Sequence, residues 1–155
     1  MSEKEDTKIR LELPSRLIML RPLNCFVEEL IRYVRPDLDE KSAQSIALVL
    51  HEAFTNICRH AYGGKEDGIV VIRILMRANE LELCFEDEGV PFDEQSWKEP
   101  DLDQLQESGK GVWIIKKLVD EFIYESGPGG RNILKLIKKL PDASLVQQRS
   151  ELPDP

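Results

Sequence analysis

Residues 69–86 carry two strand patterns in close succession, and these limit the kind of sheet that the chain can form. Residues 69–76 are mostly β-branched. In residues 80–86, Leu81, Leu83 and Phe85 alternate with glutamates and Cys84. Because successive side chains of a strand point to opposite faces, the second strand has one apolar and one mostly polar face. A sheet built on this strand is expected to be covered on one face.

The other elements follow from the spacing of apolar residues. Apolar residues recur at helical spacing in 17–35, 39–62 and 111–121, and Ser15 can cap the first of these helices. Shorter strand patterns occupy 9–13, 122–126 and 132–140. This order predicts an α+β fold, a two-layer sandwich in which three helices cover a mixed, largely antiparallel sheet.

Length and charge fit one domain with loose ends. Of the 155 residues, we expect 9–140 to form the domain, 1–8 a flexible N-terminus and 141–155 a flexible C-terminal tail. The net charge of -8 argues against direct nucleic-acid binding, which needs a basic surface, and fits basic partners or plain solubility. The sequence shows no signal peptide and no apolar run of membrane-spanning length. A cytoplasmic protein without a membrane role is therefore expected.

The first candidate site lies on the second predicted helix. Glu52 and Asn56 are four residues apart, so they share a helix face at the rim of the apolar stripe. A carboxylate there can position a hydroxyl group or accept its proton, and an amide oxygen can ligate Mg²⁺. The alternative is an ordinary polar helix surface, which on the residues alone also accounts for Arg59.

The second candidate site follows the strand at 80–86. Alternation places Asp87 on the same buried face as Leu81, Leu83 and Phe85. A buried carboxylate is costly unless a polar group meets it. A purine amino group is one such partner, and Gly89 would let a flat ring approach the backbone. The alternative is that the strand has already ended and that Asp87 lies in a solvated turn.

The third candidate site is Gly109-Lys110-Gly111, at the start of the last predicted helix. Exposed N–H groups and the helix dipole favour anions at such a terminus, and Lys110 adds positive charge. The alternative is a simple helix-start loop. The polar connection at 88–110 is long for an unstructured loop, and loops of this length are often lids.

In their order along the chain, these segments resemble the N, G1 and G2 boxes of the histidine-kinase, gyrase, chaperone and mismatch-repair ATPases (the GHKL superfamily, with the Bergerat fold). Glu52-Ala-Phe-Thr-Asn56, followed by His60-Ala61-Tyr62, is similar to the motif of the anti-sigma-factor serine-protein kinases. The resemblance covers about residues 9–140.

The resemblance implies a site for ATP or ADP with Mg²⁺. In this site Glu52 is the catalytic general base, Asn56 ligates Mg²⁺, and Asp87 binds the adenine amino group, with residues 93–108 as a lid. The other residues expected at the nucleotide are Arg59, Gly89, Phe92, Gly109, Lys110, Gly111, Val112 and Asn132.

The implied function is that of an ATP-dependent serine-protein kinase and anti-sigma factor. Such a protein phosphorylates an anti-anti-sigma-like partner and sequesters a sigma factor, and the resemblance allows a homodimer. Three residues depart from the family pattern. Glu107 stands where many members have an arginine, Lys110 replaces an apolar residue, and Asn132 replaces a threonine. Glu107 favours the alternative function, a nucleotide-binding regulatory interaction module without kinase activity.

Overall fold

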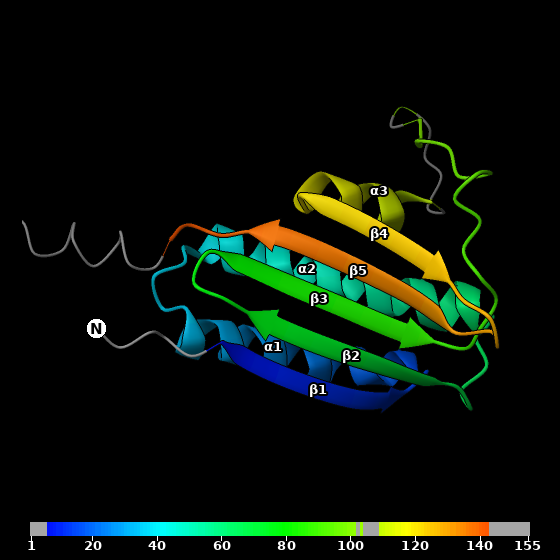
Figure 1. The fold of residues 1–155 in the computed structure, drawn as a ribbon, viewed down its shortest axis with the longest axis horizontal. Coiled ribbons are helices and arrows are strands. Elements are labelled where there is room, and N and C mark those ends of the chain that lie inside the picture. Colours follow the sequence, from blue (N-terminus) through cyan, green and yellow to red (C-terminus); the bar gives the residue numbers. More distant parts are fainter. Residues whose placement is uncertain (1–5, 102, 104–108, 143–155) are drawn as a thin grey trace, which may run out of the picture.

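The computed structural model describes residues 6–101, 103 and 109–142. Within these ranges a sheet forms one layer and helices form the other (Figure 1). The strands are β1 (Thr7–Pro14), β2 (Ile69–Met76), β3 (Glu80–Asp87), β4 (Glu121–Ser126) and β5 (Asn132–Lys139). The helices are α1 (Leu20–Val34), α2 (Glu40–Asn56) and α3 (Lys110–Leu118).

The sheet has five strands in the order β1-β2-β3-β5-β4. Every neighbouring pair of described strands is antiparallel, so the largely antiparallel α+β sandwich predicted from the sequence is confirmed, without the parallel pairing of a mixed sheet. β5 lies between β3 and β4 and pairs antiparallel with β3, so the last residue of β3 is opposite the first residue of β5. Asp87 and Asn132 are paired in this register.

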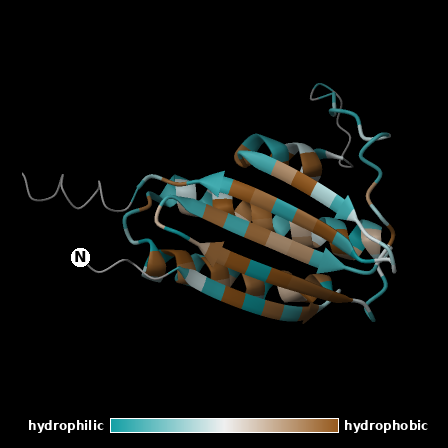
Figure 2. Ribbon diagram, in the orientation of Figure 1, coloured by the Kyte–Doolittle hydropathy of each residue, from teal (hydrophilic) through white to brown (hydrophobic). Residues whose placement is uncertain are grey.

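The core lies between the helices and one face of the sheet, as the alternation in β3 predicted. Figure 2 shows apolar and polar residues alternating along β1 and β3, whereas β2 is apolar apart from Arg73. Phe54 of α2, Ile72 of β2, Phe85 of β3 and Leu136 of β5 are almost completely shielded from solvent. The central helix, α2, packs against both α1 and α3. None of the helices in the described ranges has both the length and the apolar character needed to traverse a lipid bilayer.

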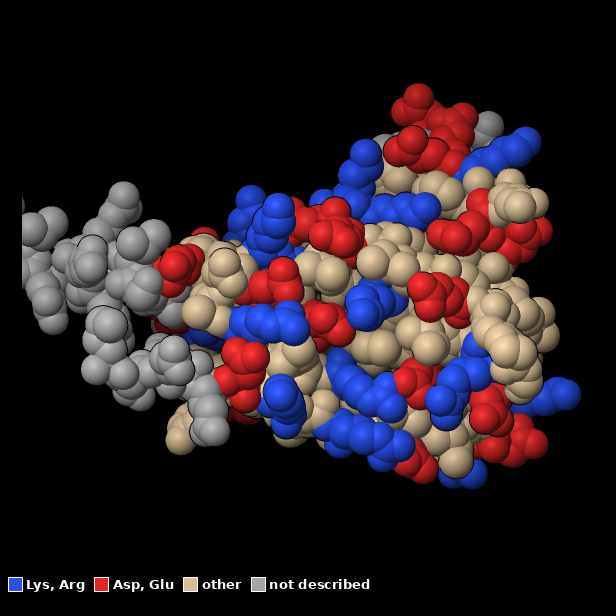
Figure 3. Space-filling model, in the orientation of Figure 1, with Lys and Arg blue, Asp and Glu red and all other residues tan. Residues whose placement is uncertain are grey.

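The other face of the sheet is open and carries charges in rows across the strands. The register gives a middle row of Arg10, Arg73, Cys84, Lys135 and Ile123. The neighbouring row contains Glu12, Val71, Glu86, Ile133 and Glu125. Arg73 forms an ion pair with Glu86 between the two rows. Figure 3 shows basic and acidic side chains interspersed over this face.

Two predicted element ends differ in the structure. Ser15 does not cap a helix, because a 3-10 turn at Leu17–Met19 precedes α1. Its hydroxyl instead donates to the carbonyl of Lys65 at 2.7 Å and accepts from the N–H of Gly68 at 3.1 Å. The last helix ends at Leu118 rather than near residue 121, because Val119 is already extended and β4 begins at Glu121. At α2 the predicted start is confirmed, with Asp39 as its N-cap.

Candidate functional site

A cavity of about 420 Å³ lies between the C-terminal end of α2, the end of β3 and helix α3. Its lining includes residues from all three sequence candidates, namely Asn56, Asp87, Phe92, Gly109 and Val112. A larger hollow of about 600 Å³ lies on the open face of the sheet. None of the predicted site residues lines that hollow, so the smaller cavity is the candidate site.

Asp87 is a buried carboxylate in the wall of this cavity. Strand β3 continues through Asp87, which is only 7% exposed. The alternative of a solvated turn is therefore wrong. Its Oδ1 accepts hydrogen bonds from Asn132 Nδ2 at 2.8 Å and from the backbone N–H of Gly89 at 2.9 Å. Burial raises the pKa of Asp87, and these two hydrogen bonds offset the shift in part. Among the described residues, no hydrogen bond reaches Oδ2, which leaves an acceptor for a ligand.

Asn132 positions Asp87 and does not line the cavity. It is completely buried, and its Nδ2 also donates to the carbonyl of Gly89 at 2.9 Å. Its Oδ1 accepts from the hydroxyl of Ser126 at 3.0 Å. The family resemblance implied that Asn132 contacts the nucleotide. In the structure it lies behind the cavity wall, where it supports Asp87.

Gly89 is pressed against the end of helix α2. The helix closes in a π-turn at Ile57–Ala61, and the carbonyl of Ala61 accepts from the N–H of Val90 at 2.7 Å. A Cβ atom on Gly89 would collide with the backbone of Ala61. This contact is a reason for glycine that differs from the expected approach of a flat ring. The π-turn was not predicted, although such turns are frequent at functional sites.

Tyr62 ties the same region to the sheet. Its hydroxyl donates to the carbonyl of Ile69 at 2.7 Å and accepts from the N–H of Glu88 at 3.0 Å. Its ring occupies the space beside Gly68 where a Cβ atom would lie. The tyrosine of the sequence motif therefore joins the start of β2 to the end of β3, next to Asp87.

The first turn of α3 lies against the polar face of α2. A Cβ atom on Gly111 would be 2.8 Å from Glu52 Oε2 and 3.0 Å from Asn56 Oδ1, so only glycine fits without displacing these side chains. Gly109 begins the helix with a φ of 92°, a conformation that favours glycine. In the described ranges, no hydrogen bond or ion pair occupies the Glu52 carboxylate or the Asn56 amide. These groups lie beside the positive end of the α3 dipole and are free to bind a ligand.

The remaining predicted residues are less central. Arg59 is exposed and does not line the cavity, while Lys110 is the partly buried first residue of α3. Of the predicted lid, the structure describes 93–101 and 103, and Glu107 lies outside the described residues. The lid begins with a turn in which the Asp93 carboxylate accepts from the N–H groups of Gln95 and Ser96. The described residues hold no group of three His, Cys, Asp or Glu side chains placed to bind a metal ion.

Sequence reasoning missed several aromatic residues of the cavity. Trp97, Phe122 and Tyr124 line it together with the predicted Phe92. The Tyr124 hydroxyl accepts from the N–H of Phe92 at 2.7 Å, and the two rings meet edge to face at 5.7 Å. Alternation in β4 was a usable signal for Phe122 and Tyr124, because both point to the covered face. Trp97 sits in a polar segment without a periodic pattern, which gave no signal.

Comparison with known protein families and sequences agrees with this arrangement. Residues 13–138 match the family model of the histidine kinase-like ATPase domain. The chain is 35% identical over 97 residues to the serine-protein kinase RsbW of Bacillus pumilus, which covers 56% of this chain and 59% of the relative. The RsbW of Listeria monocytogenes serovar 1/2a is 26% identical over 103 residues, covering 60% of this chain and 66% of the relative. The match thus spans less than two thirds of these curated relatives.

Solved structures show the same fold. The RsbU and RsbW domains of Rv1364c from Mycobacterium tuberculosis align with a TM-score of 0.62 at 15% identity, over 87% of this chain and 33% of that one. The histidine kinase domain of a blue-light activated histidine kinase from Erythrobacter litoralis EL346 aligns with a TM-score of 0.52 at 20% identity, over 90% and 66%. At these identities the likeness is one of fold.

Proposed function

The chain belongs to the histidine kinase-like ATPase domain family, and on that premise we propose that it is an ATP-dependent serine-protein kinase and anti-sigma factor. Its phosphoacceptor is a serine on an anti-anti-sigma-like partner, and its second partner is a sigma factor that it holds inactive. The relatives named serine-protein kinase support the reaction class. The observation that carries the proposal is the meeting of Glu52, Asn56 and Gly111 at the edge of a cavity that contains Asp87.

Nucleotide binding is supported by the polar groups around an otherwise apolar and aromatic cavity. A buried carboxylate with an unused acceptor suits the amino group of adenine, because a charge-assisted hydrogen bond offsets part of the cost of burial. The exposed N–H groups at the start of α3, with Gly109 on the cavity wall, suit phosphate oxygens. The site thus offers groups of the right kind for both ends of a nucleotide.

Glu52 and Asn56 fit the roles of base and metal ligand. Mg²⁺ is usually held by one or two protein oxygens together with substrate phosphates, and Asn56 Oδ1 is such an oxygen. Bound there, Mg²⁺ would neutralise phosphate charge during transfer. Glu52 would accept the proton of the serine hydroxyl as its oxygen bonds to the γ-phosphorus, while the bond from that phosphorus to ADP breaks.

The alternative is a nucleotide-binding regulatory module that transfers no phosphate. The negative charge of Glu107 favours this function, since many relatives place an arginine suited to the terminal phosphate at that position. In such a module, nucleotide occupancy would tune the affinity for a protein partner without chemistry.

Two measurements test the proposal. Calorimetry with Mg-ADP should show binding to the wild type and a ten- to hundredfold weaker affinity for Asp87→Asn, as expected from losing a charge-assisted hydrogen bond worth about 1.5–3 kcal/mol. Labelled ATP should then transfer phosphate to a serine of a partner that copurifies from the native host. If Mg-ADP binds and Asp87→Asn weakens the binding, but no phosphate is transferred, the regulatory module would be favoured. Absence of Mg-ADP binding would overturn both functions.

A further inference from the structure

The two tryptophans of the chain both lie where the described lid segment meets α3, but their indole N–H groups differ. Trp113 Nε1 donates to Glu99 Oε1 at 2.9 Å. Trp97 Nε1 is buried and has no hydrogen-bond partner among the described residues. Trp97 lines the candidate cavity, whereas Trp113 does not.

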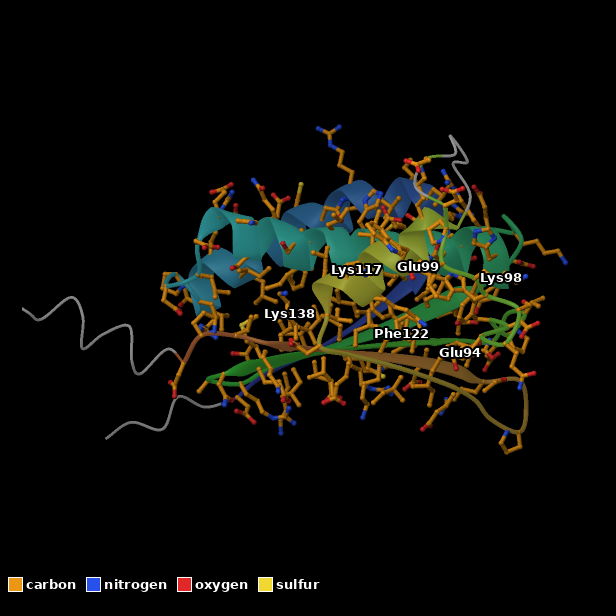
Figure 4. All side chains as sticks on the ribbon, turned by 90° about the horizontal axis from the view of Figure 1, so that it is seen from above. Glu94, Lys98, Glu99, Lys117, Phe122 and Lys138 are labelled. Carbon is orange, nitrogen blue, oxygen red and sulfur yellow. The ribbon has the colours of Figure 1, made fainter. Side chains whose placement is uncertain are left out.

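The Trp97 ring is held in place by a cation. Lys116 Nζ lies 4.4 Å from the centre of the Trp97 ring and 4.8 Å from the centre of the Phe122 ring, so the ammonium is sandwiched between the two. Two residues after Trp97, Glu99 forms an ion pair at 3.6 Å with Lys117, the neighbour of Lys116 in α3. Figure 4 shows Phe122 between α3 and the sheet, with Glu99 and Lys117 above it. Residues 97–99 are thus fastened to α3, and Trp97 forms a side of the cavity.

The unpaired indole N–H is the unusual feature of this wall. Buried tryptophan N–H groups generally find an acceptor, because an unsatisfied buried donor is costly. Since Trp97 Nε1 is shielded from solvent, an acceptor can reach it only if the segment around Trp97 shifts slightly. A ligand that supplies an acceptor would compensate for that shift, and a nucleoside offers both ring nitrogens and ribose oxygens.

We propose that Trp97 is a nucleotide-contacting residue whose ring forms one wall of the site and whose N–H donates to the base or ribose. Lys116 positions the ring, and nucleotide binding moves the segment around Trp97. The inference rests on the proposed function, because it takes the cavity to be the nucleotide site. It adds a residue and a coupled movement that the three sequence boxes do not contain.

Affinity measurements on three variants test the contact. Trp97→Phe keeps an aromatic ring but loses the N–H together with part of the ring area, so Mg-ADP affinity should fall about two- to tenfold. Trp97→Ala also removes the ring and should weaken binding roughly five- to a hundredfold, the range for loss of base–aromatic contact. Trp113→Phe is the matched control and should stay within about twofold. An equal loss in Trp113→Phe would assign the effect to lid attachment and overturn the proposal.

Fluorescence tests the movement separately. In Trp113→Phe the only tryptophan is Trp97, and with excitation selective for tryptophan over tyrosine, saturating Mg-ADP should change its emission. In Trp97→Phe, where Trp113 is the only tryptophan, the change should be small. This inference alone would be overturned if Mg-ADP binds and Asp87→Asn weakens the binding, while Trp97 emission stays unchanged and both Trp97 variants keep wild-type affinity. If the wild type does not bind Mg-ADP, the proposed function fails, and the inference fails with it.

Discussion

Folding and the proposed nucleotide binding make opposite demands on Asp87. The carboxylate is buried at the end of β3, and this burial raises its pKa. An ionised carboxylate there lowers the stability of the fold, yet a carboxylate with a free oxygen is what an adenine amino group needs. The hydrogen bonds from Asn132 and Gly89 reduce the cost without occupying both oxygens. Strain of this kind is expected at a binding site rather than in a structural core.

Replacing Asp87 by Asn should therefore separate stability from binding. A carboxyl whose pKa is raised by folding contributes stability that is present below its ordinary pKa and is lost as pH rises through the raised value. Asp87→Asn, which cannot ionise, should be at least as stable as the wild type at neutral pH, and its advantage should shrink in acid. Urea unfolding of both proteins across acidic and neutral pH measures this difference. A variant that is less stable at neutral pH would mean that the carboxylate supports the fold.

In the wild type, the affinity for Mg-ADP should rise with pH, whereas ionisation of Asp87 lowers the stability of the fold. Below the raised pKa the protonated Asp87 loses its anionic acceptor, so Mg-ADP affinity should decline as pH falls through that range. In Asp87→Asn the residual affinity should depend less on pH, because the variant has no carboxyl group at this position. Calorimetric titrations of the two proteins at matched pH values make the comparison. Parallel pH profiles would assign the dependence to another group.

Substitutions of Glu52 and Asn56 should affect different measurements, although the two residues share one helix face. Asn56 would hold the metal in the ground state, so Asn56→Ala should weaken nucleotide binding with Mg²⁺ and have less effect in chelator. Glu52 would act on the incoming hydroxyl, so Glu52→Ala should keep Mg-ATP affinity within a few-fold and lose phosphate transfer by roughly 10²–10⁴-fold. Nucleotide titrations and transfer of labelled phosphate measure the two effects. If Glu52→Ala abolishes binding, Glu52 orders the nucleotide and is not the base.

At the scale of elements, the site depends on how closely α3 approaches α2. Gly111→Ala should displace the Glu52 carboxylate and the Asn56 amide, because the new methyl group would lie 2.8 Å from Glu52 Oε2 and 3.0 Å from Asn56 Oδ1. Since the proposed metal ligand would then leave its place, we expect Mg-ADP affinity to fall roughly tenfold, which corresponds to about 1.4 kcal/mol. Gly127→Ala is the control, because its nearest neighbour would be at an ordinary 3.7 Å. Equal affinities in the two variants would show that the helix contact does not shape the site.

Local patterns in the sequence predicted the elements, the resemblance to known ATPases identified the boxes, and contacts between distant segments account for what neither showed. Alternation offered a buried position for Asp87 beside the alternative of a solvated turn, and i,i+4 spacing put Glu52 and Asn56 on one helix face. No local pattern shows that Gly89 meets Ala61, that Gly111 meets Glu52, or that Asn132 bonds to Asp87 across 45 residues. These contacts depend on strand order and on the π-turn, which arise only when the layers pack. Trp97 was missed because its position depends on Lys116 of α3.

At the scale of the whole molecule, the two ends of the sheet have different roles. Strands β3 and β5 lie side by side (Figure 1). Asp87 and Asn132 pair at one end of these strands, and the cavity lies at that end. Glu80 and Lys139 pair near the other end. There Arg35, at the end of α1, is 3% exposed and binds Asp37 through two hydrogen bonds. Its guanidinium also donates to the carbonyls of Ala78, between β2 and β3, and Pro141, beyond β5. This arginine joins the two layers away from the site.

Removing Arg35 should consequently destabilise the fold without altering the site. Arg35→Ala breaks a buried ion pair and leaves two carbonyl groups without their donor, which should lower the free energy of unfolding by about 3–5 kcal/mol. Arg35→Lys keeps the charge but not the planar fork and should be intermediate. The control is Arg32→Ala, whose exposed pair with Glu29 is worth at most about 1 kcal/mol. Denaturant unfolding measures all three variants.

Under conditions where Arg35→Ala remains folded, its Mg-ADP affinity should stay within about twofold of wild type, because its contacts lie at the far end of the sheet. Weaker binding by folded Arg35→Ala would show that the two ends are coupled, and unfolding equal to that of Arg32→Ala would show that the buried network adds no stability.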